Sequence, residues 1–117
     1  MSIELLIGDA HFSAMLYENE TARAFAERLP MTLRMSDLNG NEKYHYMSTP
    51  IPTCETYYPT IPAGELMLFG DKCVVLFYDR AGGFDYTPIG KLLNISGLQE
   101  ALGTGDISIT FTTANNS

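Results

Sequence analysis

The sequence has no tryptophan, only two cysteines, and seven lysine and arginine residues against fourteen aspartate and glutamate residues. The net charge of −7 opposes binding to nucleic acid and to anionic membrane surfaces, so we expect neither as a partner. Cys54 and Cys73 lack the close spacing of a metal-binding or redox pair. We therefore expect two buried free thiols and no disulfide framework.

Long apolar runs are also missing. The longest, at residues 74–78, is far shorter than the roughly 20 residues of a membrane-spanning helix, and the N-terminus leads into an acidic strand rather than a basic leader. These features predict a soluble, cytoplasmic protein. A length of 117 residues with 45% hydrophobic residues predicts one domain over residues 1–117, whose core needs no metal or disulfide for stability.

Alternating apolar and polar residues predict that most of the chain forms β-strands. Asn39 and Gly40 give the strongest hairpin signal. Residues 48–63 contain four prolines and are expected to form a long loop over the body. Two of the predicted strands are apolar on both faces, as expected if one face lies in a core and the other is covered by a helix. The predicted strands are residues 3–7, 12–16, 31–36, 43–47, 66–69, 73–78, 90–95 and 107–112.

One helix is predicted at residues 20–29, where an apolar stripe centred on Phe25 follows helical spacing. Asn19 is a suitable N-cap and Pro30 ends the pattern. Charged residues on the outer face, including Arg23 and Arg28, are expected to be solvated.

A second, shorter helix is predicted at residues 97–102, from a capping box formed by Ser96 and Gln99 and a C-terminal cap at Gly103. Eight hairpin-connected strands with two helices predict a mainly-β fold. We expect a closed eight-stranded antiparallel barrel with the helices capping its two openings, because closure removes exposed strand edges.

The order of these elements resembles the cyclophilin barrel, and the C-terminal half resembles the minimal bacterial and archaeal cyclophilin-like proteins. The resemblance covers about half of the chain. It is carried by residues 64–70 (GELMLFG), 73–78 (CVVLFY), 86–92 (YTPIGKL) and 98–106 (LQEALGTGD). It implies a cyclophilin-like barrel and no particular activity, because this group of proteins is largely uncharacterised.

Cyclophilins proper are prolyl isomerases that use an arginine, glutamines and a histidine. Arg34 lies on the strand that would carry the arginine, but its sequence context differs from the family's. Val74 stands where the family has a strand glutamine, Tyr86 stands at the histidine position, and residues 43–47 contain no glutamine. The resemblance therefore implies the barrel with most of the isomerase signature missing.

Tyrosines supply the main candidate for a binding surface. The resemblance places several of them around one groove, where they could contact an apolar ligand or an extended peptide, although half-buried strand tyrosines fit the same pattern. Arg34 is similarly either a ligand-binding cation or the polar position of an amphipathic strand. The candidate binding residues are Arg34, Tyr44, Tyr46, Met67, Phe69, Leu76 and Tyr86.

Neither catalysis nor a bound cofactor is indicated by a motif. His11 and His45 lack a third ligand at metal-binding spacing, and no nucleophile has a recognisable base. We therefore predict no metal, no cofactor and no catalytic residue. The favoured hypothesis is a binding module for a small apolar molecule or a peptide segment. The alternatives are a weak or divergent prolyl isomerase with Arg34 as its cation, and an interaction domain without a pocket.

Overall fold

The computed structural model describes residues 1–114, which form nine strands and two helices. Because chain ends fray unless they are tied down, the sequence predicts a frayed tail over residues 114–117. Residues 115–117 lie outside the described residues, and Ala114 follows the last strand. The elements are β1 (Ser2–Ile7), β2 (Ala10–Leu16), α1 (Glu20–Ala26), β3 (Met31–Leu38), β4 (Glu42–Tyr46), β5 (Thr56–Tyr58), β6 (Glu65–Phe69), β7 (Cys73–Phe77), β8 (Phe84–Leu92), α2 (Leu98–Leu102) and β9 (Ile107–Thr113).

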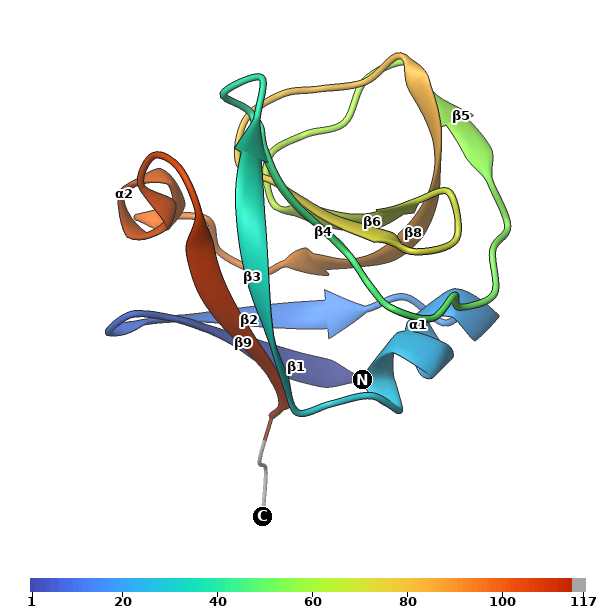
Figure 1. Cartoon of the computed structure of the whole chain (residues 1–117), viewed down its shortest axis with the longest axis horizontal. Coiled ribbons are helices and arrows are strands. Elements are labelled where there is room, and N and C mark those ends of the chain that lie inside the picture. The colour runs from blue at the N-terminus through green and yellow to red at the C-terminus, as the bar shows by residue number, and fades with distance from the viewer. Residues whose placement is uncertain (115–117) are drawn as a thin grey trace.

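Eight of the strands form a closed antiparallel barrel (Figure 1). Their order is β2-β1-β9-β3-β4-β7-β6-β8, and a further pairing between β2 and β8 joins the two ends of the sheet. The first strand pairs with the second and with the last, as expected for closure. The predicted barrel is confirmed.

Alternation along the strands sets which side chains fill the barrel. In β1, Ile3, Leu5 and Ile7 are buried and the residues between them are partly exposed. The β3–β4 hairpin turns at Asn39 and Gly40, whose φ angles of 56° and 66° define the type I′ geometry that the Asn-Gly pair predicts. Period-two patterning and turn chemistry thus account for these strands.

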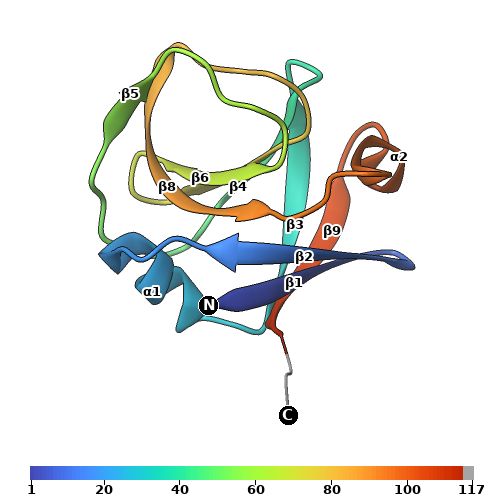
Figure 2. The same ribbon diagram turned by 180° about the vertical axis from the view of Figure 1, so that it is seen from behind.

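The helices cover opposite sides of the barrel in both views (Figure 1, Figure 2). The Asn19 side chain caps α1 by accepting a hydrogen bond from the Ala22 backbone N–H, and the buried Phe25 ring packs edge-to-face on Phe111, with 5.6 Å between ring centroids. Leu98 and Leu102 of α2 are buried in the same core. Both helices therefore close the core, as predicted.

The helix boundaries differ from the prediction in two respects. α1 ends at Ala26 rather than at residue 29, and turn-like hydrogen bonds from residues 28 and 29 replace its last turn. The predicted capping box of Ser96 and Gln99 is not formed. Gly97, at a left-handed φ of 81°, is the N-cap of α2, and no side chain caps the helix.

The predicted strand at residues 90–95 is the largest error. β8 begins at Phe84 and ends at Leu92, and it pairs successively with β5, β6 and β2. The first half of β8 was not predicted as a strand because it contains Pro88, which lacks a backbone donor. In the structure Pro88 lies opposite Met67, beside a shift in the β6–β8 register. The segment at 48–63 was also wrongly expected to lack strands, since β5 pairs with the start of β8.

Two further expectations are corrected by the packing. The outer side of β6 and β7 is covered by no helix among residues 1–114. Instead, Ile61, Tyr86 and partly buried Tyr58 pack against Met67, Cys73, Val75 and Phe77 as a second apolar cluster. Arg28 is not simply solvated: its guanidinium donates to the carbonyl oxygens of Thr49 and Pro50. These bonds hold the chain after β4 against α1.

Replacing Phe25 with alanine is expected to reduce the free energy of unfolding by about 3 to 5 kcal/mol, because a fully buried ring leaves a cavity. Arg23→Ala, on the exposed face of the same helix, should change it by less than about 0.5 kcal/mol. Denaturant melts measure both values. Equal losses would show that the two faces of α1 are misassigned.

Gly90→Ala tests the barrel closure. An added Cβ at this position would lie 2.6 Å from the Met15 carbonyl oxygen on β2, so the backbone must shift at the closing strand pair. We expect a loss of about 1 to 3 kcal/mol in denaturant melts. Ser13→Ala, at an exposed position of β2, is the control and should lie within about 0.5 kcal/mol of the parent. A Gly90→Ala value as small as the control would contradict the close approach.

Candidate functional site

A cavity of about 650 Å³ lies outside the main core, beside β4, β7 and the first half of β8. The segments around residues 59–60 and 80–83 form its far side, and the ribbon traces this region as an arc above the barrel (Figure 1). The size suits a small ligand. The cavity is lined by Leu38, Asn39, Asn41, Glu42, Tyr44, Tyr46, Pro59, Thr60, Phe69, Cys73, Val75, Arg80, Ala81, Gly82, Gly83, Phe84 and Tyr86.

Aromatic rings make up much of the cavity wall. Phe69 contacts Phe84 and Tyr86, with 6.4 Å and 5.6 Å between ring centroids, and Tyr44 meets Tyr46 edge-to-face at 6.0 Å. Phe84 is 59% exposed, Tyr46 is 63% exposed and Phe69 is 42% exposed. The cavity thus presents large apolar surfaces to solvent.

Period-two alternation explains how the wall is built. Glu42, Tyr44 and Tyr46 occupy alternate positions of β4, so they share one side of that strand. Phe84 and Tyr86 do the same on β8. All five residues line the cavity, so both strands contribute to its wall.

The far side of the cavity is held by a short backbone pairing. Ile61 and Ala81 exchange backbone hydrogen bonds of 2.8 Å and 3.0 Å, and Gly83 donates to the Tyr58 carbonyl oxygen. Gly82 has a φ of 140°, and a Cβ there would collide with the Pro59 backbone. Only glycine therefore lets these two segments approach so closely.

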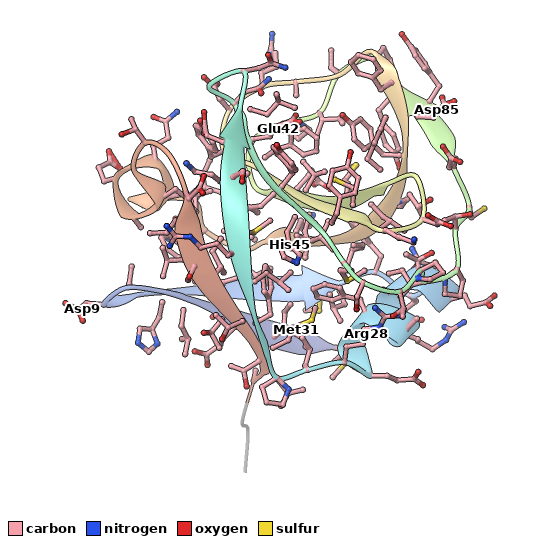
Figure 3. The ribbon with its side chains drawn as sticks, in the orientation of Figure 1. Asp9, Arg28, Met31, Glu42, His45 and Asp85 are labelled. Atoms are coloured by element: carbon pink, nitrogen blue, oxygen red, sulfur yellow. The ribbon has the colours of Figure 1, made fainter. Side chains whose placement is uncertain are left out.

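Glu42 is the acidic group of the cavity and is only 8% exposed. Figure 3 shows it near the β3–β4 turn, on the side of the arc. No hydrogen bond or ion pair within residues 1–114 reaches its carboxylate. Burial, with a smaller contribution from the Asp37 charge, raises the pKa of Glu42 above its usual range.

Two other groups of the cavity wall, the Tyr86 hydroxyl and the Cys73 thiol, are protonated at neutral pH. Burial first, and then the Glu42 charge, raises the pKa of the Tyr86 hydroxyl to about 12. Burial also raises the pKa of the Cys73 thiol to about 11, although the Tyr46 hydroxyl beside it acts in the opposite direction. A neutral thiol is a poor nucleophile, so Cys73 serves as part of the apolar wall.

A second cavity, of about 350 Å³, lies beside Tyr17, Tyr58, Glu65 and Met67. Its carboxylate differs from that of Glu42, because Tyr17 donates a hydrogen bond to Glu65 at 2.9 Å. Glu65 therefore accepts a hydrogen bond from the chain, whereas Glu42 accepts none from the part of the chain that the structure describes.

The candidate residues from the sequence fall in three places. Tyr44, Tyr46, Phe69 and Tyr86 line the larger cavity, and Met67 lines the smaller one. Leu76 is fully buried in the main core. Arg34 is exposed on β3, pairs with Ser108 of β9, and lines neither cavity.

Sequence reasoning missed Glu42, Asn41 and Phe84. The signal for Glu42 was present, because it lies two residues before Tyr44 and shares its side of the strand. It was lost because the predicted strand began at residue 43. Phe84 was missed with the first half of β8. Cys54, expected to be buried, is exposed.

Within residues 1–114, no group of three or more histidine, cysteine, aspartate and glutamate side chains is arranged to hold a metal ion. None of the helices described there has the length and apolarity needed to cross a membrane.

Glu42→Gln is expected to raise the free energy of unfolding at pH 8. The pKa of Glu42 is raised in the folded state, so ionisation above that pKa costs folding free energy, and the cost disappears as pH falls to the unfolded pKa. The advantage of the variant should therefore shrink toward pH 4. Urea melts at both pH values measure it, with exposed Glu27→Gln as control. A Glu42→Gln protein less stable than its parent at pH 8 would contradict the prediction.

Comparisons with known proteins agree with the barrel. The chain resembles the solution structure of the hypothetical protein AF2241 from Archaeoglobus fulgidus, with 22% identity, a TM-score of 0.71, and coverage of 97% of this chain and 95% of that one. It also resembles McbB, solved in complex with tryptophan, with 13% identity and a TM-score of 0.71. That match covers 98% of this chain but only 45% of McbB.

A search of curated proteins finds no match. The sequence model of the Cyclophilin-like family, however, matches residues 5–112, nearly the whole chain. With the closed barrel and its two helices, this match shows that the chain belongs to the Cyclophilin-like family.

Proposed function

We propose that the protein is a binding module whose larger cavity takes a small, predominantly apolar molecule with an aromatic ring. The observation that carries the proposal is the exposed aromatic wall around a concave volume of about 650 Å³. Exposed aromatic side chains gathered in a cavity mark binding sites, because covering them removes apolar area from water. The ring faces also favour a second ring in stacked or edge-to-face contact.

The fold shared with McbB makes indole a sensible first probe, because the McbB structure was solved with tryptophan bound. A peptide segment that presents an aromatic or apolar side chain is the other occupant considered. It would use the same wall, so both classes can be tested with the same variants.

Binding of indole is tested by two-dimensional NMR titration of the protein and of Phe84→Ala. Removing one ring of the wall is expected to weaken binding about three- to ten-fold. Tyr57→Ala is the matched control, because Tyr57 is also an aromatic residue with 59% exposure but does not line the cavity. Equal effects of the two substitutions, or no shifts around the cavity with indole and with an aromatic peptide, would refute the proposal.

Prolyl isomerase activity is expected to be absent or very weak. The barrier to rotation is about 20 kcal/mol, and a catalyst must bind the twisted amide better than the planar one. Arg34, the cation considered for this role, lies outside both cavities, and the Tyr86 hydroxyl stands at the family's histidine position. The apolar wall alone would bind both forms of the amide similarly.

An exchange measurement on an Ala-Pro peptide at increasing protein concentration tests this expectation. We expect shifts without faster cis/trans exchange. A strong enhancement that is lost in Arg34→Ala would establish the isomerase instead.

A further inference from the structure

One end of the larger cavity carries hydrogen-bond acceptors that receive no hydrogen bond from residues 1–114. Glu42 is more than nine-tenths buried, and neither of the two ion pairs among residues 1–114 includes it. The Asn41 side chain in the same lining donates through Nδ2 to the Arg80 carbonyl oxygen at 3.2 Å. This bond orients the amide, because a carbonyl can only accept, and it leaves the buried Asn41 Oδ1 without a partner.

Neither the lysine next to Glu42 in the sequence nor the arginine in the cavity lining forms an ion pair with it. Lys43 points to the other side of β4, where its Nζ contacts Asp37 at 3.1 Å and donates to the carbonyl oxygens of Gly103 and Gly105. Arg80 is exposed at the cavity edge and forms no ion pair with Glu42. Of the side-chain atoms described, only Asn41 Oδ1 is both fully buried and unpaired, so the Glu42 oxygens keep access to the cavity. A largely desolvated carboxylate that is open only to the cavity can accept hydrogen bonds from a ligand there.

Aromatic rings line the same cavity as this acid. Tyr44 and Tyr46 lie on its own side of β4, and Tyr86 is close enough for the Glu42 charge to affect its hydroxyl. An ammonium group placed among these rings would gain cation–π attraction in addition to the charged hydrogen bond. A metal ion is a poorer occupant, because no second carboxylate, histidine or thiolate cluster joins Glu42 within residues 1–114.

We propose that the ligand of this cavity is an arylalkylamine, whose ring contacts the Phe69, Phe84 and Tyr86 wall and whose alkylammonium group donates to the Glu42 carboxylate. This inference rests on the proposed function and specifies its ligand. The amine supplies both the charge and the donors that the cavity lacks, and the net charge of −7 favours approach of a cation. Tryptamine is a suitable probe, since it combines an indole ring with a primary ammonium.

Calorimetric titrations compare three probes with the same ring: tryptamine (cationic), 3-methylindole (neutral) and indole-3-propionate (anionic). For the wild-type protein, tryptamine should bind about ten-fold more tightly than 3-methylindole, and indole-3-propionate should bind most weakly. In Glu42→Gln the tryptamine preference should fall below about two-fold, with binding of 3-methylindole unchanged. Glu65→Gln is the matched control, because that half-buried carboxylate lies in the other cavity; it should keep the preference.

The outcomes separate this inference from the proposed function. Binding of all three probes with similar affinity, or a tryptamine preference that survives in Glu42→Gln, would overturn the arylalkylamine assignment and leave the cavity as an aromatic-binding site. Tighter binding of 3-methylindole than of tryptamine would overturn it as well. No binding of any probe would overturn both. A preference lost in Glu42→Gln and retained in Glu65→Gln would support both.

Discussion

The close approach of β2 and β8 is the constraint on which the rest of the structure depends. It converts an eight-stranded sheet into a barrel, and it requires the absence of a side chain at Gly90, whose position leaves no room for a Cβ beside the Met15 carbonyl. The same strand continues in the other direction to Phe84 and Tyr86, which line the cavity. The contact that closes the core therefore also positions one wall of the candidate site.

The inner and outer faces of the barrel wall belong to two different apolar clusters. Side chains that point inward, together with Phe25 of α1 and Leu98 of α2, form the main core. Outward-facing residues of β6 and β7 are covered by Ile61, Tyr58 and Tyr86 as a smaller cluster that borders the cavity. This cover is thin, because it consists of a short strand and two loop segments rather than a helix. Space for a ligand remains where the cover ends.

Much of the fold could be predicted, and the site only in part. Four of the seven candidate residues line the larger cavity, because the family resemblance grouped the tyrosines around one groove, although it did not locate the strand that carries Tyr86. Leu76 was misplaced because β7 is apolar on both faces, and periodicity cannot assign such residues to one side. Arg34 lies on the expected strand, but it is exposed and lines neither cavity. Glu42 was omitted by a boundary error of one residue, at the β4 end next to the turn.

The sequence by itself determined the strands with alternating patterns, the Asn39–Gly40 turn, the Asn19 cap and the closed barrel, because these follow from local periodicity, turn chemistry and the cost of open edges. Only the tertiary structure decided the course of β8 and the partners of Glu42. A strand that contains Pro88 pairs through three different neighbours, which no local pattern reveals. Burial and the lack of a donor are likewise properties of the assembled walls, so an acidic residue beside a turn becomes an unpaired carboxyl only once the barrel and its cover have formed.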